Sequence, residues 1–219
     1  YAQLLKGKNR SALKVVTGRD ARISGPMIHS LVNQTLVGMG VNVINLELST
    51  TPTVAVAVTM EKADGGIIIT ASHNPKEWNA LKLLNSSGEF INFEEGRKIL
   101  DFVEFENPLY SKTDFLGKII KKENYIDKHI ESALNLQFID IEGIKKLNFK
   151  VVVDGVNSSG GIAIPKLLRK LNIQVIELNC IPNGVFSHNP EPIQENLTEI
   201  CNAVKHYNAD LGIAVDPDV

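Results

Sequence analysis

Short apolar runs alternate with amphipathic stretches along most of the chain. The runs are rich in valine and isoleucine, as in residues 65–71, which is typical of buried strands. Residues 24–40 instead carry Ile28, Val32 and Leu36 at helical spacing. The pattern therefore predicts alternating strands and helices. We expect strands at residues 13–18, 41–46, 65–71, 80–85, 150–155, 173–178 and 209–215, and helices at residues 24–40, 50–63, 92–105, 124–135, 160–172 and 193–208.

Polar residues mark several of the expected helix starts. Ser24 and Asn92 precede periodic stretches and can cap them. The segment 50–63 is ambiguous, because its valines alternate as in a strand, whereas Thr51 as cap followed by Pro52 suits the start of a helix. We favour the helix.

The alternation of strands and helices indicates βαβ units, in which helices cover both faces of a mainly parallel sheet. Residues 106–123 are polar, contain Pro108 and Gly117, and show no clear period, so we interpret them as a linker or irregular connection. We expect two three-layer α/β/α domains with mixed, mainly parallel sheets, at residues 1–123 and 124–219. The first and last segments have the pattern of elements truncated at both ends of the chain.

Composition limits the class of protein. The 23 Lys and Arg residues nearly balance the 25 Asp and Glu residues, and the net charge of −2 gives no support for a nucleic-acid partner. The apolar runs stay far below the roughly 20 residues of a membrane span. The chain opens without an initiator Met or a signal peptide, and Cys180 and Cys201 lack metal-ligand spacing. We therefore expect a cytoplasmic protein with reduced thiols and no membrane partner.

Three polar clusters directly follow predicted strands. They are TGRD (residues 17–20), TASHNP (residues 70–75) and DPDV (residues 216–219). Ligands of parallel α/β sheets gather at the carboxyl ends of strands, so each cluster is a candidate site. Ser72 and His73 in the second cluster are either reactive groups at the mouth of a strand or turn residues of a solvated loop.

The last cluster can bind a hard cation. Asp216 and Asp218 are two residues apart and Pro217 favours an extended Asp216, so both carboxylates can point the same way and offer oxygen ligands. A turn that merely closes the strand is the other interpretation, and the spacing alone slightly favours it. In the first cluster, Arg19 can bind a phosphate through its forked guanidinium or pair with an acid at the surface.

A turn of small residues, VNSSGG at residues 156–161, precedes a predicted helix. Such a turn can cradle an anion at the helix N-terminus. We favour the alternative, in which the small residues allow the helix to pack tightly against the strand.

TASHNP, together with residues 78–82 behind it, resembles the phosphoserine loop of the α-D-phosphohexomutases. This family comprises the phosphoglucomutases, phosphomannomutases and phosphoglucosamine mutases. Its loop reads T-[AG]-S-H-N-P, then a short gap, then N-G-x-K. Residues 70–75, Asn79 and Lys82 match, and Ala80 stands where the family usually has Gly.

Further motifs of this family occur in the same order along the chain. ADLGIAVDPDV at residues 209–219 is similar to the strand before the family's metal loop, which usually reads D-G-D-G-D-R. Pro217 and Val219 replace its two glycines, and the third Asp and the Arg would follow Val219. The other motifs are GRDARISG at residues 18–25, VVVDGVNSSGG at residues 151–161 and NPEPIQENL at residues 189–197.

The resemblance implies an enzyme of phosphoryl transfer in which Ser72 carries the phosphate. Such enzymes move phosphate between the 1- and 6-hydroxyls of a hexose through a bisphosphorylated sugar, starting from a resting phosphoserine. The resemblance also implies a Mg²⁺ ion bound by Ser72, Asp216 and Asp218, because a divalent cation offsets the negative charge of the phosphate.

Three basic side chains acquire roles through the same resemblance. Arg19 would bring positive charge to the phosphoryl group, Lys82 is the candidate general acid/base, and His73 would orient or assist. From the pattern alone, a solvated lysine at the edge of a sheet is the simpler interpretation of Lys82, and the resemblance reverses that preference.

Whole members of the family have four domains, of which this chain resembles the first two. The other two supply the specificity loop and the phosphate clamp, so a hexose phosphate would bind mainly outside this chain. Ala71 favours a phosphoglucosamine mutase over a phosphomannomutase or phosphoglucomutase. A non-catalytic sugar-phosphate-binding module is the alternative from another class, and a serine hydrolase is disfavoured because G-x-S-x-G is absent. Nothing in the pattern indicates an oligomeric state.

Overall fold

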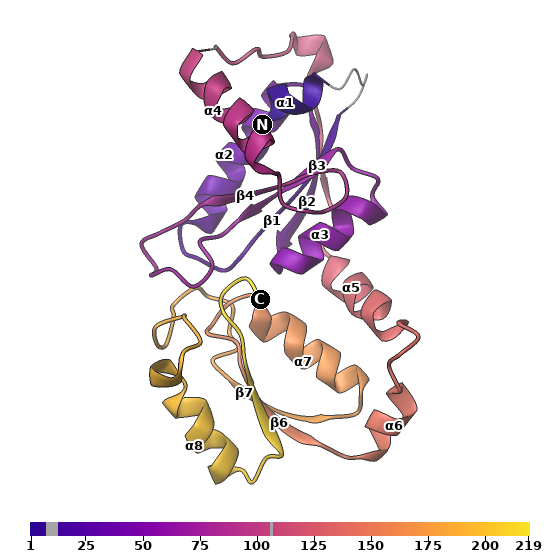
Figure 1. The fold of residues 1–219 in the computed structure, drawn as a ribbon, viewed down its shortest axis with the longest axis vertical. Coiled ribbons are helices and arrows are strands. Elements are labelled where there is room, and N and C mark those ends of the chain that lie inside the picture. Colours follow the sequence, from indigo (N-terminus) through magenta and orange to yellow (C-terminus); the bar gives the residue numbers. More distant parts are fainter. Residues whose placement is uncertain (8–12, 106) are drawn as a thin grey trace.

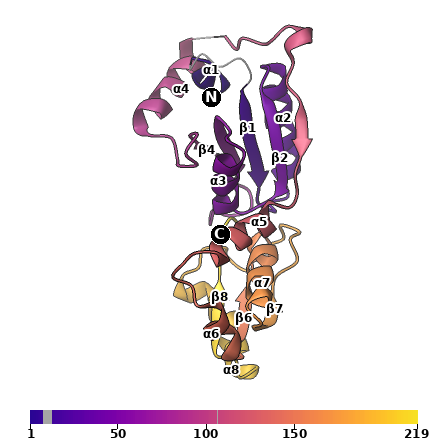
Figure 2. The same cartoon turned by 90° about the vertical axis from the view of Figure 1, so that its right-hand side faces the viewer.

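Two sheets organise the chain, one in each of two α/β/α domains that lie end to end (Figures 1 and 2). The computed structural model describes residues 1–7, 13–105 and 107–219. The strands of the first sheet are β1 (Lys14–Arg19), β2 (Asn42–Leu48), β3 (Gly65–Ile69), β4 (Leu81–Leu84) and β5 (Ile119–Lys121), and those of the second are β6 (Lys150–Asp154), β7 (Gln174–Leu178) and β8 (Leu211–Ala214).

Most strand pairs are parallel. The first sheet has the order β4-β3-β1-β2-β5 and the second the order β7-β6-β8. Among the described strands, only β3 and β4 pair antiparallel, with Ile68 opposite Lys82. The expected mixed, mainly parallel α/β fold is therefore confirmed, and the carboxyl ends of β1 and β3 lie at the same edge of the first sheet.

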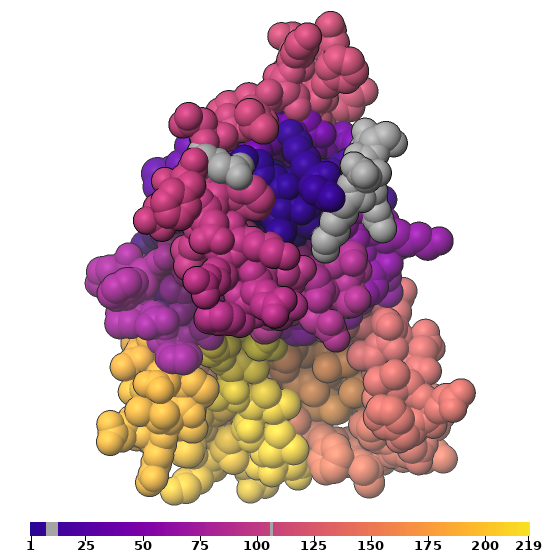
Figure 3. All heavy atoms as spheres, turned by 45° about the horizontal axis from the view of Figure 1, so that its top comes forward, coloured from indigo at the N-terminus to yellow at the C-terminus, as the bar shows by residue number. Residues whose placement is uncertain are grey.

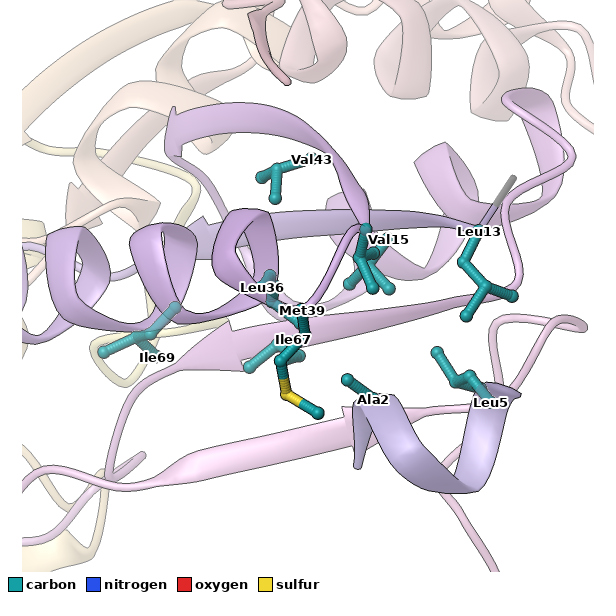
Figure 4. Packing of buried hydrophobic residues seen from close by; sticks show 10 residues of the cluster. Ala2, Leu5, Leu13, Val15, Leu36, Met39, Val43, Ile67 and Ile69 are labelled. Carbon is teal, nitrogen blue, oxygen red and sulfur yellow. The ribbon is translucent and has the colours of Figure 1, made fainter. Parts of the chain in front are cut away.

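Helices α2 (Gly25–Gly38) and α3 (Thr51–Met60) cover opposite faces of the first sheet. On the α2 side, the buried apolar cluster also takes in α1 (Ala2–Lys6), as Figure 4 shows. On the α3 side, Val16, Ile44 and Ile68 pack against the helix. Because successive strand residues point to opposite faces, β1, β2, β3 and β4 each contribute to both layers. Each buried side chain of this size stabilises the fold by roughly 1.5–3 kcal/mol.

The second sheet is covered in the same way by α7 (Gly160–Lys170) and α8 (Thr198–His206). Val151 and Val153 of β6 pack against Leu168 of α7. On the other face, Gly212 of β8 lets α8 approach closely, since a Cβ there would lie 3.1 Å from the Ile200 side chain.

Helix α5 (Tyr125–Leu134) connects the two domains. Tyr125 is buried in the apolar cluster of the first domain, while Asp127 forms an ion pair of 2.9 Å with Lys166 of α7. In the space-filling view, the second domain lies directly beneath the first (Figure 3). The remaining helical elements are α4 (Phe93–Phe105), which lies beside α1, α6 (Ile141–Lys146), and the 3₁₀ turns Thr113–Phe115 and Gln194–Asn196.

Residues 107–123 are more ordered than the sequence suggested, and residue 106 of the expected connection lies outside the described residues. Their last part forms β5, which extends the first sheet by pairing parallel with β2, with Val43 opposite Ile119. The interpretation of this segment as a linker or irregular connection was wrong for β5, because a strand of three residues is too short to show an alternating pattern of its own. Gly117 allows the approach, since a Cβ there would lie 1.9 Å from the Val41 carbonyl oxygen.

The helix favoured at residues 50–63 is present as α3, but its cap is Thr50 rather than Thr51. The Thr50 hydroxyl accepts a hydrogen bond of 3.2 Å from the Thr53 N–H. The expected cap of α4 is confirmed, because Asn92 Oδ1 accepts from the Glu95 N–H at 2.9 Å.

The single helix expected at residues 193–208 is divided into a 3₁₀ turn and α8. The Asn196 side chain donates 2.8 Å to the Glu191 carbonyl. This bond folds the first part of the segment back on the preceding proline-rich loop, so α8 begins only at Thr198.

The start of α7 predicts a stability difference between two helical glycines. A Cβ on Gly161 would lie 2.6 Å from Cys180 Cα and 2.8 Å from its carbonyl oxygen, whereas no atom lies within 4 Å of a Cβ on Gly96 in α4. We expect Gly161→Ala to lower the free energy of unfolding by about 1–3 kcal/mol through overpacking. Gly96→Ala should raise it by up to about 1 kcal/mol through helix propensity. Urea denaturation measures both, and equal effects would contradict the close packing at Gly161.

Candidate active site

Ser72 and Asp216 meet between the two domains. Ser72 follows β3 of the first domain, and Asp216 follows β8 near the C-terminal end of the chain, which lies between the domains in Figures 1 and 2. The Ser72 hydroxyl donates a hydrogen bond of 2.6 Å to Asp216 Oδ2. Ser72 also has a φ of 52°, a left-handed conformation that is uncommon for a residue other than glycine and that clusters at functional sites.

Lys82 and Asp218 form a second contact between the domains. Lys82 Nζ lies 2.7 Å from Asp218 Oδ2, and the Asp218 side chain is only 3% exposed. The same carboxylate oxygen accepts from the Thr51 hydroxyl, and the Asp218 carbonyl accepts from the Thr51 N–H at 2.8 Å. The carboxylate thus lies at the N-terminus of α3, where the helix dipole favours a negative charge.

These contacts keep Asp218 ionised. Burial raises its pKa, but the hydrogen bonds from Lys82 and Thr51 and the charge of Lys82 outweigh burial and hold the pKa below its ordinary value. The site therefore contains an ionised carboxylate 2.7 Å from Lys82 Nζ, next to the Ser72 hydroxyl.

Two buried serines hold the turn that carries both aspartates. The hydroxyls of Ser158 and Ser159 donate to the Pro217 carbonyl at 2.7 Å and 2.8 Å. Ser158 Oγ also accepts from the Ala21 N–H of the first domain at 3.1 Å. Sequence analysis missed this function of the serines, although it favoured tight packing for the same turn. That interpretation is supported, because a Cβ on Gly160 would lie 2.3 Å from a Val215 methyl group.

Arg22 fixes the backbone of the Ser72 loop (residues 70–79), and sequence analysis did not select it. Its side chain is fully buried, and its Nε donates to Asp20 Oδ2 at 3.1 Å. The two terminal nitrogens donate four further hydrogen bonds of 2.6–2.9 Å to backbone carbonyls, so all five N–H groups are used. The four carbonyls belong to Ser72, Asn74, Pro75 and Trp78.

Asp20 completes this arrangement. Its Oδ2 also accepts from the Thr70 hydroxyl at 2.8 Å, and its Oδ1 accepts from the Arg22 N–H at 3.0 Å. The spacing of Asp20 and Arg22 in GRDARISG is the sequence signal that could have pointed to this pair. Farther along, Ser24 occupies the N-cap position of α2, but its hydroxyl accepts from Asn79 Nδ2 at 3.0 Å instead of from the helix.

Arg19 and His73 have other surroundings. Arg19 donates to the Asp20 carbonyl at 3.1 Å and lies 3.9 Å from Glu47 Oε2. Its side chain passes the start of α2, since a Cβ on Gly25 would lie 3.4 Å from Arg19 Cδ. The guanidinium that contacts the Ser72 loop is therefore that of Arg22. His73 is exposed, and within the described ranges its side chain makes no hydrogen bond.

The oxygen atoms around Ser72 suit a hard cation in part. Ser72 Oγ and the carboxylates of Asp216 and Asp218 are the ligand type that Mg²⁺ prefers. The expected extended backbone is not present, because Pro217 and Asp218 form a turn and Asp216 Oδ1 accepts from the Val219 N–H at 2.9 Å. Both carboxylates nevertheless lie beside the Ser72 hydroxyl. The described residues include no group of three or more His, Cys, Asp or Glu side chains arranged for a metal ion.

Comparison with known proteins identifies the family. The model for phosphoglucomutase/phosphomannomutase, alpha/beta/alpha domain I matches residues 1–108, and that for domain II matches residues 123–219. The chain belongs to this family, which agrees with the resemblance noted in the sequence.

Individual relatives agree with this assignment. A phosphoglucomutase/phosphomannomutase of Thermococcus kodakarensis is 38% identical over 219 residues, which cover 100% of this chain and 47% of that protein. A "probable phosphoglucosamine mutase" of Methanosphaera stadtmanae is 37% identical, with 99% of this chain and 47% of that protein covered. The crystal structure of a phosphoglucomutase/phosphomannomutase family protein of Burkholderia thailandensis matches with a TM-score of 0.79 and 25% identity, covering 99% of this chain and 47% of that one.

The chain thus spans about half the length of the curated relatives that it matches. None of the helices within the described ranges has the length and apolar character needed to cross a membrane.

The contacts of Arg22 predict that no other cation can replace it. A lysine keeps the charge but can donate at most three hydrogen bonds, so Arg22→Lys leaves buried carbonyls unpaired. We expect this variant to lose at least about 2 kcal/mol of unfolding free energy, and Arg97→Lys on the exposed face of α4 to lose almost none. Chemical denaturation measures both. An unchanged stability of Arg22→Lys would show that the five contacts do not hold the loop.

Proposed function

We propose that this chain forms the phosphoserine half of a phosphohexomutase. Ser72 carries a phosphoryl group that passes between O1 and O6 of a hexose phosphate through a bisphosphorylated sugar. The observation that carries the proposal is the contact of the Ser72 hydroxyl with Asp216, beside the Lys82–Asp218 ion pair. A hydroxyl, two carboxylates and an ammonium group are the groups that phosphoryl transfer requires, because its catalysis is mostly positioning and charge stabilisation.

The residues have separate roles in the proposed step. The bond between phosphorus and Ser72 Oγ breaks, and a bond from phosphorus to a sugar hydroxyl oxygen forms. Lys82, the candidate general acid/base, gives a proton to Ser72 Oγ as it leaves and then takes up the proton that the sugar hydroxyl loses. Asp216 orients Ser72 Oγ as its hydrogen-bond acceptor. Arg22 holds the loop backbone so that Ser72 keeps its position during the transfer.

We infer that Mg²⁺ belongs to this site, with Ser72, Asp216 and Asp218 as its protein ligands. When bound, it offsets the charge of the phosphoryl oxygens and withdraws electron density from phosphorus. Arg19 and His73 are the weaker candidates for catalytic roles. The contacts of Arg19 lie away from the Ser72 hydroxyl, and the exposed His73 side chain makes no hydrogen bond within the described ranges.

The preferred substrate is a glucosamine phosphate. Ala71 in the loop and the name of the M. stadtmanae relative support it. A phosphomannomutase or phosphoglucomutase is the alternative within the family, because the T. kodakarensis relative is named for those activities. A non-catalytic sugar-phosphate-binding module is the alternative from another class, and it requires neither phosphoserine nor metal.

We further infer a domain division between residues 123 and 124 and an action in the cytoplasm. The last strand of the first sheet ends at Lys121 and the match to the second domain of the family begins at residue 123. Both cysteines, Cys180 and Cys201, are free thiols, which suits a reducing compartment.

Phosphorylation of Ser72 tests the proposed function. After incubation of the full-length protein with a hexose 1,6-bisphosphate, we expect peptide mass spectrometry to find phosphate on Ser72. Ser72→Ala should lose this phosphate and at least about 10³-fold in mutase turnover, as for removal of a nucleophile. Ser86→Ala, in the exposed turn after β4, should behave as the wild type. Phosphate found only on other hydroxyls, or full turnover of Ser72→Ala, would overturn the proposal and favour the binding module.

A further inference from the structure

A loop of the second domain reaches the residues that organise the Ser72 loop. This segment, residues 181–188, follows β7 and is called the 181–188 loop. Gly184 has a φ of +73°, and a Cβ there would lie 2.0 Å from the Ala21 carbonyl oxygen and 3.1 Å from the Ile23 nitrogen. The backbone of the loop is therefore in direct contact with the two residues that flank Arg22.

Phe186 of this loop lies over the Arg22 guanidinium, whose carbon is 5.2 Å from the centre of the ring. A cation at this distance from an aromatic face is attracted by the ring quadrupole. The edge of the guanidinium is already saturated, because its five N–H groups are all donated to oxygen atoms. The flat face is what remains for a further interaction, and the ring occupies it without competing for a hydrogen bond.

The 181–188 loop is itself held firmly to the second domain. The Gly184 N–H donates to the Asn157 carbonyl at 3.0 Å, and Asn157 Nδ2 donates to the Val185 carbonyl at 2.9 Å. At the end of the loop, His188 Nε2 lies 3.0 Å from Asp154 Oδ2. The loop is thus anchored on both sides of Phe186.

The His188 contact is strengthened by charge. Burial lowers the pKa of His188, but the Asn189 carbonyl and the Asp154 carboxylate outweigh burial, so the pKa lies above its ordinary value. Asp154 is buried at the end of β6 and also accepts from the Val156 N–H at 3.0 Å. The anchor therefore joins the loop to the same turn whose serines hold the Pro217 carbonyl.

We propose that Phe186 is a positioning residue for the Ser72 loop: its ring immobilises Arg22 from the second domain, and Arg22 in turn holds the carbonyls of Ser72 and its neighbours. The second domain then contributes to the site twice, through the Asp216–Asp218 turn and through the 181–188 loop. The consequence for catalysis rests on the proposed function, whereas the effect on the loop backbone does not.

The experiment tests whether the aromatic ring itself is needed. If any apolar side chain over the Arg22 guanidinium were sufficient, leucine would replace phenylalanine without effect. Phe186→Leu keeps an apolar side chain but removes the π face, and Phe186→Tyr keeps it. Val185→Ala is the matched control, since the Val185 side chain is 57% exposed in the same loop.

Hydrogen–deuterium exchange of the full-length protein, read by mass spectrometry over peptides of residues 70–79, tests the proposal. We expect Phe186→Leu to raise exchange in these peptides at least about two- to fivefold, because a cation–π contact of a buried guanidinium contributes no less than an exposed one. Phe186→Tyr and Val185→Ala should exchange as the wild type. Peptides of β1 and β6 serve as internal references and should not change in any variant.

Three outcomes would overturn the positioning role. The first is unchanged exchange of the 70–79 peptides in Phe186→Leu, and the second is equal exchange of these peptides in Phe186→Leu and Phe186→Tyr. The third is an increase in exchange that the reference peptides share. Steady-state kinetics supply a second readout. Phe186→Leu should lower kcat with KM nearly unchanged, and Phe186→Tyr, which keeps the ring, should have the kcat of the wild type. If the wild type has no mutase turnover while the exchange pattern holds, the proposed function fails and the positioning role stands.

Discussion

The candidate site depends on the docking of one turn of the second domain against two side chains of the first. Asp216 accepts from the Ser72 hydroxyl at 2.6 Å, and Asp218 pairs with Lys82 at 2.7 Å. Neither domain contains the site alone. A buried carboxylate such as Asp218 is costly unless it is paired, so the docked arrangement is the one in which its charge is compensated. The ion pair and the helix N-terminus at Thr51 therefore specify where the second domain sits.

Supporting contacts keep both sides of this interface rigid. In the first domain, Arg22 joins four carbonyls of the Ser72 loop to the buried Asp20, and only a planar guanidinium has enough donors for this. In the second domain, Ser158 and Ser159 fix the Pro217 carbonyl, and Ser158 also receives the Ala21 N–H. These contacts explain how Ser72 is kept in a left-handed conformation that an isolated loop would leave.

Much of the fold and part of the site could be predicted from the sequence. The apolar runs were sufficient for most strands, and the polar residues after them located Ser72, Asp216 and Asp218, because side chains at the carboxyl ends of parallel strands come together. Strand β5 escaped prediction since it is defined by its pairing with β2 and not by a pattern of its own.

The choice between two arginines illustrates what the sequence alone does not contain. Arg19 is still part of β1, so the strand directs it to the α2 side, toward Glu47. Arg22 lies beyond the strand and finds partners 50 to 56 residues away. Such partners are set by tertiary structure. The same holds for Phe186, whose place over Arg22 depends on the docking of the domains.

A double-mutant cycle between Lys82 and Asp218 tests the central claim, that the site is assembled from both domains. Lys82→Met, Asp218→Asn and the double variant are compared by their free energies of unfolding in denaturant. Because Asp218 is buried and the pair is in direct contact, we expect a coupling energy of about 1–2 kcal/mol, with the double variant less destabilised than the sum of the single variants. A coupling below about 0.3 kcal/mol, the level expected for independent sites, would contradict the account.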